Sequence, residues 1–369
     1  MEFTFYCQEG SPSFIFTPDT LNTRGLGGAE QGLISLTEAL AKKGHRVTVY
    51  NQGLDGEQVF NGVTYKHTDL FDMGEPREIF VLYRNPMDCL PCVNADVKLF
   101  FSCDQQTAGD YDYEIFPFVD GVITISEYHK DYFLNRYDHA VAERIFPIDL
   151  GVRTEEYARG VPKIPNSLLY CSVPDRGLQF LPKLFQTIRF LVPDATLTIT
   201  GGYSLWGDGY SDLNERFVKM FEGIEGVKFL GKVPRAELVK LQLQSDILAY
   251  PNVPVGDFAE LFGLSVAECQ VAGCIPVTSQ YGAFRTTVLP EGILIVNQNG
   301  DTLHPSDSEY TNRFVMSVVE LLSDRPRLMR QQKRLREKAL QRFHWQNIVE
   351  QWEEAIAQVK AMPELTYVD

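Results

Sequence analysis

Strands and helices alternate along this chain, and that alternation limits its fold more than any other feature. An apolar stretch at residues 2–7 predicts a short strand, and a glycine-rich turn follows at 22–28. From residue 29, apolar side chains recur at spacings of four, three and four residues, which is typical of one helix face. A second strand is predicted at 45–52. Because parallel strands need a crossover of this kind, the unit predicts a parallel sheet.

The alternation continues through the chain and breaks once, near residue 160. We predict further strands at 79–85, 97–103, 120–126, 144–151, 168–172, 195–202, 227–231, 246–251, 275–279 and 292–296, and helices at 127–137, 177–191, 234–244 and over most of 309–361. The segment 161–165 is typical of a linker. The expected fold class is α/β, with two Rossmann-like doubly wound domains, residues 1–160 and 161–344. Such sheets bind ligands at the carboxyl ends of their strands, so a cleft across which the two domains face each other is the expected site.

Charge and cysteine content exclude several classes of protein. The chain has 369 residues and a net charge of −15, and so acidic a surface disfavours nucleic acid as a partner. The seven cysteines are odd in number and scattered, which is not typical of a disulfide framework.

The first residues lack the pattern of a signal peptide, and no apolar run reaches the roughly 20 residues that span a bilayer. We therefore expect a cytoplasmic protein.

A glycine-rich segment at residues 25–30 precedes the first predicted helix. Glycines allow a close backbone approach to a ligand, and the free N–H groups at a helix start favour an anion. Contact with a diphosphate or a sugar is one interpretation, and a flexible turn is the other. The spacing is not GxGxxG, and the next predicted strand lacks the usual ribose-binding acid, so a dinucleotide site is not predicted.

Two glutamates, Glu260 and Glu268, are separated by seven residues within the segment 257–273. The apolar spacing predicts a helix that ends at Gly273, with Glu260 in the loop before it and Glu268 about one and a half turns inside. N–H groups at the helix start could bind phosphate, and a carboxylate can accept hydrogen bonds from two ribose hydroxyls. The alternative is that both glutamates are solvated helix charges.

These segments together resemble retaining GT-B glycosyltransferases, in particular glycosyltransferase family 4. The resemblance covers most of the chain in order, and it lies in residues 27–30 with 40–50, 147–157, 260–268, 275–288 and 342–356. It implies a nucleotide-sugar-binding second domain and an acceptor-binding first domain. It also implies that a terminal helix of about residues 345–369 crosses back to complete the first domain.

The resemblance assigns a role to each matching donor-site residue. Glu268 would hold the ribose hydroxyls of the nucleotide, and Glu260 would hold hydroxyls of the donor sugar. Gly27 and Gly28 would approach the diphosphate from the first domain. Three successive residues would offer backbone N–H groups to sugar or phosphate: Phe262, Gly263 and Leu264.

The chain departs from the family pattern in its cations. Cys171 stands where the family usually has Arg, and Arg176 stands where it usually has Lys. Arg176 can still neutralise a diphosphate, because a guanidinium binds phosphate bidentately. Arg153 or Arg285 could replace the missing cation.

A second departure concerns the polar residue after the strand predicted at 97–103. The family tends to carry His there, and this chain has Asp104 followed by Gln105 as the nearest polar groups. The expected catalytic residues are therefore Glu260, Arg176 and Asp104. The resemblance implies transfer with retention and without a metal. No carboxylate placed as a nucleophile is evident in the first domain, so front-face transfer is the expected route.

Three short patterns admit a functional and a structural interpretation. Asp110 and Asp112 match a metal-binding DxD pattern, but such matches arise by chance and this fold needs no metal. Cys89 and Cys92 lack the second pair of ligands of a zinc site, so a turn with two thiols is favoured. His129 shows no metal-ligand spacing, and we expect it at a polar surface or at an edge.

Two other segments could bind ligands. The basic run at 325–342 could contact anionic lipid head groups, which would place the protein peripherally at a membrane, or it could be a solvated helix face. Tyr203, Trp206 and Tyr210 could stack on a base or a sugar, or could pack within a loop.

The expected function is transfer of a sugar from a UDP- or GDP-sugar to a saccharide, lipid-linked or other hydroxyl acceptor. The resemblance alone points to polysaccharide or glycolipid assembly as the setting, and no cofactor is expected. A nucleotide-sugar epimerase or a phosphorylase on the same fold is one alternative. An epimerase would turn over the donor without an acceptor, and the cofactor lysine of a phosphorylase is not found. A non-catalytic nucleotide- or sugar-binding protein is the other alternative, supported by the missing Arg and His.

Overall fold

The computed structural model divides the chain into two compact units. It describes residues 1–8, 16–52, 54, 56–105, 109–203, 215–256 and 258–363. The first unit contains Met1–Thr20, Ala29–Gly151 and Trp345–Asp369, and the second contains Leu21–Gly28 and Val152–His344. Residues 21–28, which include Gly27 and Gly28, and residues 152–160 therefore belong to the second unit, whereas the sequence suggested the first.

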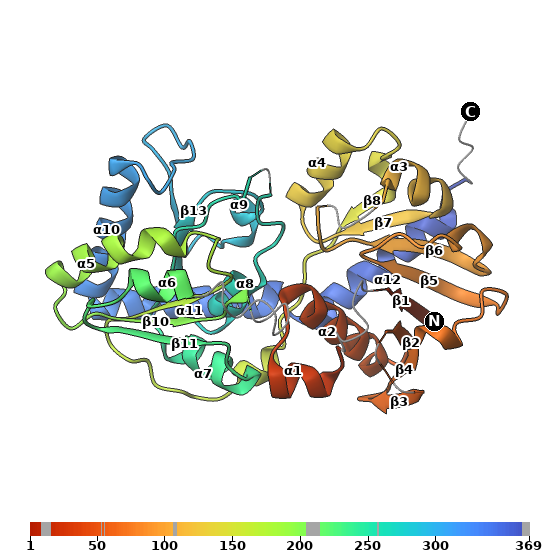
Figure 1. The fold of residues 1–369 in the computed structure, drawn as a ribbon, viewed down its shortest axis with the longest axis horizontal. Coiled ribbons are helices and arrows are strands. Elements are labelled where there is room, and N and C mark those ends of the chain that lie inside the picture. The colour runs from red at the N-terminus through yellow and green to blue at the C-terminus, as the bar shows by residue number, and fades with distance from the viewer. Residues whose placement is uncertain are drawn as a thin grey trace. The chain divides into compact units, whose positions relative to one another are not determined.

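The first unit is built on one sheet with the strand order β3-β4-β2-β1-β5-β6-β7-β8 (Figure 1). Its strands are β1 (Glu2–Cys7), β2 (Arg46–Asn51), β3 (Glu57–Phe60), β4 (Val63–His67), β5 (Arg77–Tyr83), β6 (Ala95–Phe101), β7 (Gly121–Thr124) and β8 (Ile145–Pro147). The helices of the chain before residue 152 and after residue 344 are α1 (Pro18–Arg24), α2 (Gly28–Lys42), α3 (Tyr111–Glu114), α4 (Glu127–Arg136) and α12 (Trp345–Ala361). Only the β3–β4 pair is antiparallel among the strand pairs of the described residues.

Aromatic side chains cover both faces of this sheet. Trp352 of α12 packs against Phe101 of β6, with 5.1 Å between the ring centroids. The neighbouring Phe100 packs against Tyr111 of α3 at 5.2 Å. Because successive strand residues point to opposite faces, α12 and α3 cover opposite sides of the sheet. The core of the first unit therefore has the doubly wound form that the sequence predicted.

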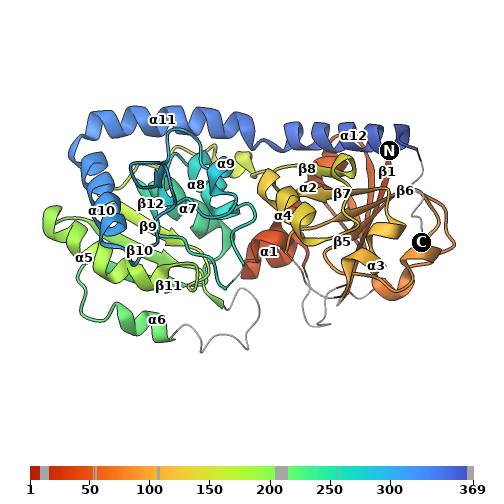
Figure 2. The same ribbon diagram turned by 90° about the horizontal axis from the view of Figure 1, so that it is seen from above.

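The second unit is built on an all-parallel sheet with the order β11-β10-β9-β12-β13-β14 (Figure 2). Its strands are β9 (Ser167–Cys171), β10 (Thr196–Thr200), β11 (Val227–Gly231), β12 (Ile247–Tyr250), β13 (Ile275–Ser279) and β14 (Ile293–Ile295). Its helices are α5 (Leu181–Leu191), α6 (Glu215–Met220), α7 (Arg235–Gln244), α8 (Leu264–Val271), α9 (Phe284–Thr287), α10 (Ser308–Ser323) and α11 (Arg325–Arg342). Helices α7 and α11 both pack on α8, and α5 packs on α10.

The predicted α/β class with two parallel sheets is confirmed. Gly273 ends α8 at φ +67°, as its position in the sequence indicated, and Gly44 follows α2 at φ +98°. The hairpin of β3 and β4 was not predicted, and it adds an antiparallel edge to the first sheet.

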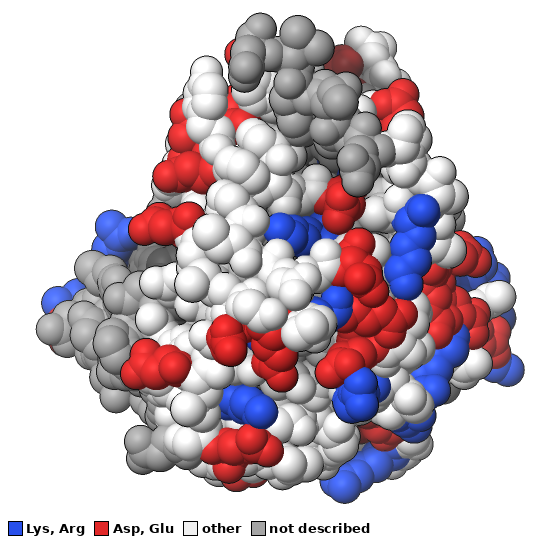
Figure 3. All heavy atoms as spheres, turned by 90° about the vertical axis from the view of Figure 1, so that its right-hand side faces the viewer, with Lys and Arg blue, Asp and Glu red and all other residues white. Residues whose placement is uncertain are grey.

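Charged residues of both signs are interspersed on the face drawn in Figure 3, where the acidic ones form the larger groups. This agrees with the net charge of −15. Among the described residues, no helix is both long enough and apolar enough to cross a membrane.

Candidate functional site

The loop that enters α8 holds several of the expected donor-site residues. Gly263 precedes the helix at φ +82°, and a β-carbon there would lie 2.2 Å from the ring of Phe284. Both the backbone conformation and the close approach therefore require glycine. Phe262 is fully buried against Phe343, with 6.0 Å between the rings. These contacts fix the position at which the first N–H groups of α8, beginning at Leu264, become available to a ligand.

Arg176 and Glu260 lie within electrostatic reach of each other beside this loop. Arg176 Nη1 donates a hydrogen bond to the carbonyl of Phe258 at 3.3 Å, two residues before Glu260. Burial by itself would lower the pKa of Arg176, but the negative charge of Glu260 contributes to raising it above the usual value. Both side chains are half-buried. The structure thus brings together two of the three expected catalytic residues.

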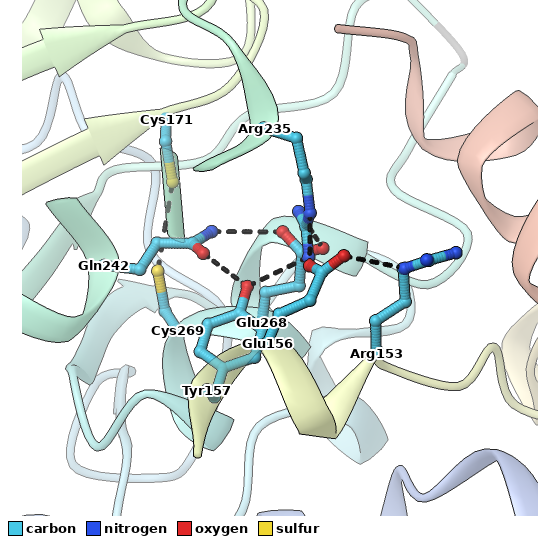
Figure 4. Close-up of polar contacts among 8 residues, drawn as sticks. All are labelled: Arg153, Glu156, Tyr157, Cys171, Arg235, Gln242, Glu268 and Cys269. Carbon is cyan, nitrogen blue, oxygen red and sulfur yellow. Dashed lines mark hydrogen bonds and ion pairs between the residues drawn. The ribbon is translucent and has the colours of Figure 1, made fainter. Parts of the chain in front are cut away.

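Glu268 lies inside α8, where its carboxylate is held from α7 (Figure 4). Its Oε1 accepts a hydrogen bond from Arg235 Nη1 at 2.6 Å, and its Oε2 accepts one from Gln242 Nε2 at 3.1 Å. Glu268 is 3% exposed and Arg235 is 4% exposed. Glu268 is therefore a buried partner in an ion pair, and the alternative of a solvated helix charge is wrong.

The ion pair continues into a larger network (Figure 4). Arg235 Nε donates to Glu156 at 2.7 Å, and Glu156 also accepts from Arg153 at 2.7 Å. The Tyr157 hydroxyl donates to Gln242 at 2.5 Å and accepts from Arg235 at 3.3 Å. Burial alone would lower the pKa of Arg235, but the charges of the adjacent acids outweigh it and raise that pKa. Arg153 is thus engaged with Glu156 in this structure.

Cys171 ends β9 at the position where the family resemblance would place Arg. Its Sγ lies 3.9 Å from the Sγ of Cys269, and both thiols are buried (Figure 4). Burial raises the pKa of Cys269 well above the usual thiol value. The Cys171 side chain therefore contributes to the packing between β9 and α8.

The third expected catalytic residue, Asp104, belongs to an ion-pair cluster of the first unit. Arg84 Nε donates to Asp104 Oδ2 at 2.6 Å, and Arg84 Nη1 donates to Glu30 Oε1 at 2.6 Å. Arg84 follows β5 with φ +63°, an unfavourable backbone conformation for an arginine. Strained residues of this kind are concentrated at functional sites. This cluster is a second candidate site, at the carboxyl ends of β5 and β6.

His129 is buried beneath this cluster, so the expectation of a surface position is wrong. Its Nε2 is 3.0 Å from the carbonyl oxygen of Asp104 and 3.4 Å from the Ser102 hydroxyl. Burial lowers the pKa of His129 to about 3, so the ring is neutral at ordinary pH. A neutral His that donates from Nε2 would help to fix the backbone at Asp104. Ser126 caps α4 by accepting the His129 N–H at 3.1 Å.

Among the remaining expected residues, Gly28 lies close to the start of α8. Gly28 is the first residue of α2, directly after Gly27. A β-carbon at Gly28 would lie 3.6 Å from that of Leu264, and both residues belong to the second unit. Arg285, considered as a replacement cation, is exposed on α9.

The described residues of two other short patterns make contacts within the fold. Asp110 caps α3, and an oxygen of Asp112 accepts the His139 N–H at 2.8 Å. No group of three metal-ligating side chains was found in the described residues. Tyr203 is buried against Phe217, while Trp206 and Tyr210 lie outside the described residues.

Sequence reasoning missed the partners of the two central carboxylates. Arg235 begins α7, and a cation is unfavourable at a helix amino terminus unless an acid lies nearby. The position of Arg235 could therefore have predicted an acidic partner. Arg84 directly follows a buried strand, and this position is a weaker indication of an acidic partner. The pairing of Arg84 with Glu30 depends on tertiary structure.

Known structures share this fold over nearly the whole chain. Sucrose-phosphate synthase from Thermosynechococcus elongatus has a TM-score of 0.69 at 16% identity, covering 98% of this chain and 99% of that one. HepE of Anabaena, in complex with UDP and glucose, has a TM-score of 0.67 at 15% identity, covering 97% and 99%. The catalytic domain of starch synthase IV from Arabidopsis thaliana, bound to ADP and acarbose, has a TM-score of 0.67 at 12% identity, covering 98% and 99%. The chain therefore has the GT-B fold.

The sequence comparison agrees with this class. Residues 171–340 match the family described as glycosyl transferases group 1. This region contains Arg176, Glu260 and Glu268. A search of curated protein sequences gives no match to the chain. The fold and the family match together support a glycosyltransferase of the GT-B class.

Proposed function

We propose that this chain is a retaining, metal-independent glycosyltransferase that uses a UDP- or GDP-sugar as donor. The acceptor is a hydroxyl of a saccharide, a lipid-linked molecule or another compound. The second unit binds the donor, and the first unit binds the acceptor. The observation that carries the proposal is the contact of Arg176 with the loop that holds Glu260 and enters α8, within the region matched by glycosyl transferases group 1.

The proposed chemistry requires stabilisation of a leaving diphosphate. The bond between the anomeric carbon and the diphosphate oxygen breaks, and negative charge grows on that oxygen. Arg176 and the first N–H groups of α8 are groups that stabilise such a charge. The acceptor hydroxyl attacks from the face that the diphosphate leaves, and its proton passes to a diphosphate oxygen. Glu260 accepts hydrogen bonds from hydroxyls of the donor sugar.

Glu268 would bind the ribose while it remains paired with Arg235. Arg235 donates to one oxygen of Glu268 and Gln242 to the other, and a carboxylate oxygen can accept more than one hydrogen bond. The network therefore holds the carboxylate in one orientation before the nucleotide arrives. The complexes of HepE with UDP and of starch synthase IV with ADP indicate which nucleotides to test first.

A thermal-shift panel tests the proposal. UDP, GDP, ADP and CMP are each added with and without Mg²⁺ to the wild type, to Glu268→Ala and to Glu237→Ala, which removes a more exposed acid of α7. A nucleotide at about a hundred times its Kd stabilises a protein by about 2.7 kcal/mol. We expect one nucleotide to raise the Tm of the wild type and of Glu237→Ala, by the same amount with and without Mg²⁺. The same nucleotide should not raise the Tm of Glu268→Ala.

Two results would contradict the proposal. If none of the nucleotides raises the Tm, the donor site assigned to the second unit is wrong. If a nucleotide binds but Glu260→Ala transfers sugar at the wild-type rate, Glu260 does not act on the donor. Binding without transfer or hydrolysis would support a nucleotide-binding protein instead.

A further inference from the structure

A cavity of about 350 Å³ lies in the second unit where α8 ends. Segment 158–163, the end of α8 and one side of α11 contribute to its lining. Four of the lining residues are cations: Arg159, Lys163, Lys333 and Arg336. None of the lining residues is Asp or Glu. A cation-lined cavity of this kind is unexpected in a chain with a net charge of −15.

Two of these cations, Lys163 and Arg336, are held by backbone carbonyl groups. Lys163 Nζ donates to the carbonyls of Ser245 at 2.6 Å and Ala272 at 3.1 Å. Arg336 Nη1 donates to the carbonyl of Val271 at 3.1 Å. Both side chains thus cap the carboxyl end of α8. A helix end carries only about half of a negative charge, so two full positive charges exceed what capping needs.

Carboxylates of the described residues offset this charge only in part. The charge of Asp246 opposes the lowering of the Lys163 pKa by burial. Arg159, Lys163 and Arg336 form no ion pair within the described residues, and the exposed Lys333 is 3.9 Å from Glu337. So long and exposed a pair contributes little. The buried acid nearest in sequence to the lining, Asp246, is already bound by Arg325 and by Gln332, the latter at 3.0 Å.

The positions of the cations restrict the ligand. Lys163 and Arg336 are fixed in the lining by backbone carbonyls, whereas Arg159 and Lys333 are exposed at its edge. Arg and Lys side chains arranged in this way bind phosphate oxygens. Leu243 and Gly273 add apolar wall, and the volume falls in the range of small-molecule sites.

We propose that this cavity binds the phosphate group of a small phosphorylated molecule. The cavity lies at the carboxyl end of α8, whereas the proposed donor site lies at its amino end. Burial lowers the pKa of Lys163, and an anion beside its ammonium group would offset that cost. Helix α11, which supplies two of the cations, runs along one side of this unit (Figure 2).

Calorimetric titration of the full chain with pyrophosphate tests the site. The titration is made with saturating UDP, which occupies the proposed donor site, and is repeated without UDP. The test variant is Arg159→Glu/Lys333→Glu, which reverses the two exposed cations of the cavity. The matched control is Arg330→Glu/Arg334→Glu, which makes the same charge change on exposed positions of α11 outside the cavity.

We expect saturable binding that is weakened about tenfold or more in the test variant. The control variant should change the Kd by about twofold at most, because its cations do not touch the cavity. Equal weakening in both variants, or no saturable binding, would overturn the proposal. Binding to phosphatidylglycerol vesicles that pyrophosphate does not displace, and that both variants lose, would also overturn it and assign these cations to a membrane surface.

The two proposals can fail separately. If UDP does not bind, the proposed donor site is wrong. The titration without UDP still tests the cavity, because the compared variants lie outside the network of Glu268. If UDP binds and pyrophosphate does not, only the cavity proposal fails.

Discussion

Arg235 Nη1 lies 2.6 Å from Glu268 Oε1, and the two side chains are almost completely buried. They join the amino end of α7 to the middle of α8. A buried ion pair is weak support for stability as such, because desolvation opposes the attraction between the charges. Removing only one of the two charged side chains is costly, since the remaining charge stays buried without a partner.

Replacing Arg235 by Met should therefore lower the free energy of unfolding by about 3–5 kcal/mol. Urea unfolding measures this change. The double variant Arg235→Met/Glu268→Leu removes both charges and should recover much of the loss, because apolar side chains then fill the space. A single variant as stable as the wild type would show that the pair does not form.

Arg176→Gln should lower kcat of the proposed transfer by about 10²–10³-fold, because one group that stabilises the leaving diphosphate is lost. Steady-state kinetics with the nucleotide sugar found in the thermal-shift panel measures this. Arg285→Gln is the control, since Arg285 is an exposed arginine of the same unit. If Arg285→Gln shows the loss and Arg176→Gln does not, the roles of the two arginines are exchanged.

The elements around the site could be predicted because their signals are local. The apolar spacing and Gly273 predicted α8, and the strand–helix alternation predicted both parallel sheets. Glu260 was placed correctly in the loop before α8, and Glu268 inside that helix. These features depend on residues close together in the sequence.

The partners of these residues could not be predicted in the same way. Glu268 and Arg235 are 33 residues apart, and their contact depends on how α7 packs on α8. Arg84 adopts φ +63°, which no local pattern indicates for an arginine. His129 was expected at a polar surface or at an edge, but tertiary packing buries it completely.

The buried His129 should make stability depend on pH. Its pKa is about 3 in the folded state and about 6.5 when exposed. Between these values the unfolded chain binds a proton that the folded chain does not, so stability falls as pH falls from about 6.5 towards 3. The contribution is about 1.4 kcal/mol per pH unit.

Unfolding by urea at about pH 6 and about pH 5 measures this dependence. His129→Gln should keep the donor to the Asp104 carbonyl and lose the titrating ring, so its free energy of unfolding should fall less over the same interval. Carboxylates contribute alike in both proteins, which makes the difference between the two slopes specific to His129. Parallel slopes would contradict burial of a neutral ring.

The conformation of Gly263 leads to a prediction with an internal control. Gly263→Ala places a β-carbon at φ +82° and 2.2 Å from the Phe284 ring, whereas Gly231→Ala places one at φ +64° with nothing within 4 Å. Both variants bear the backbone cost of about 1–2 kcal/mol, and Gly263→Ala adds about 1–3 kcal/mol because Phe284 must move. Urea unfolding should therefore rank Gly263→Ala below Gly231→Ala. Since that movement would displace the start of α8, Gly263→Ala should also weaken the proposed nucleotide binding, and Gly231→Ala should not. Equal stability of the two variants would show that Phe284 does not pack against Gly263.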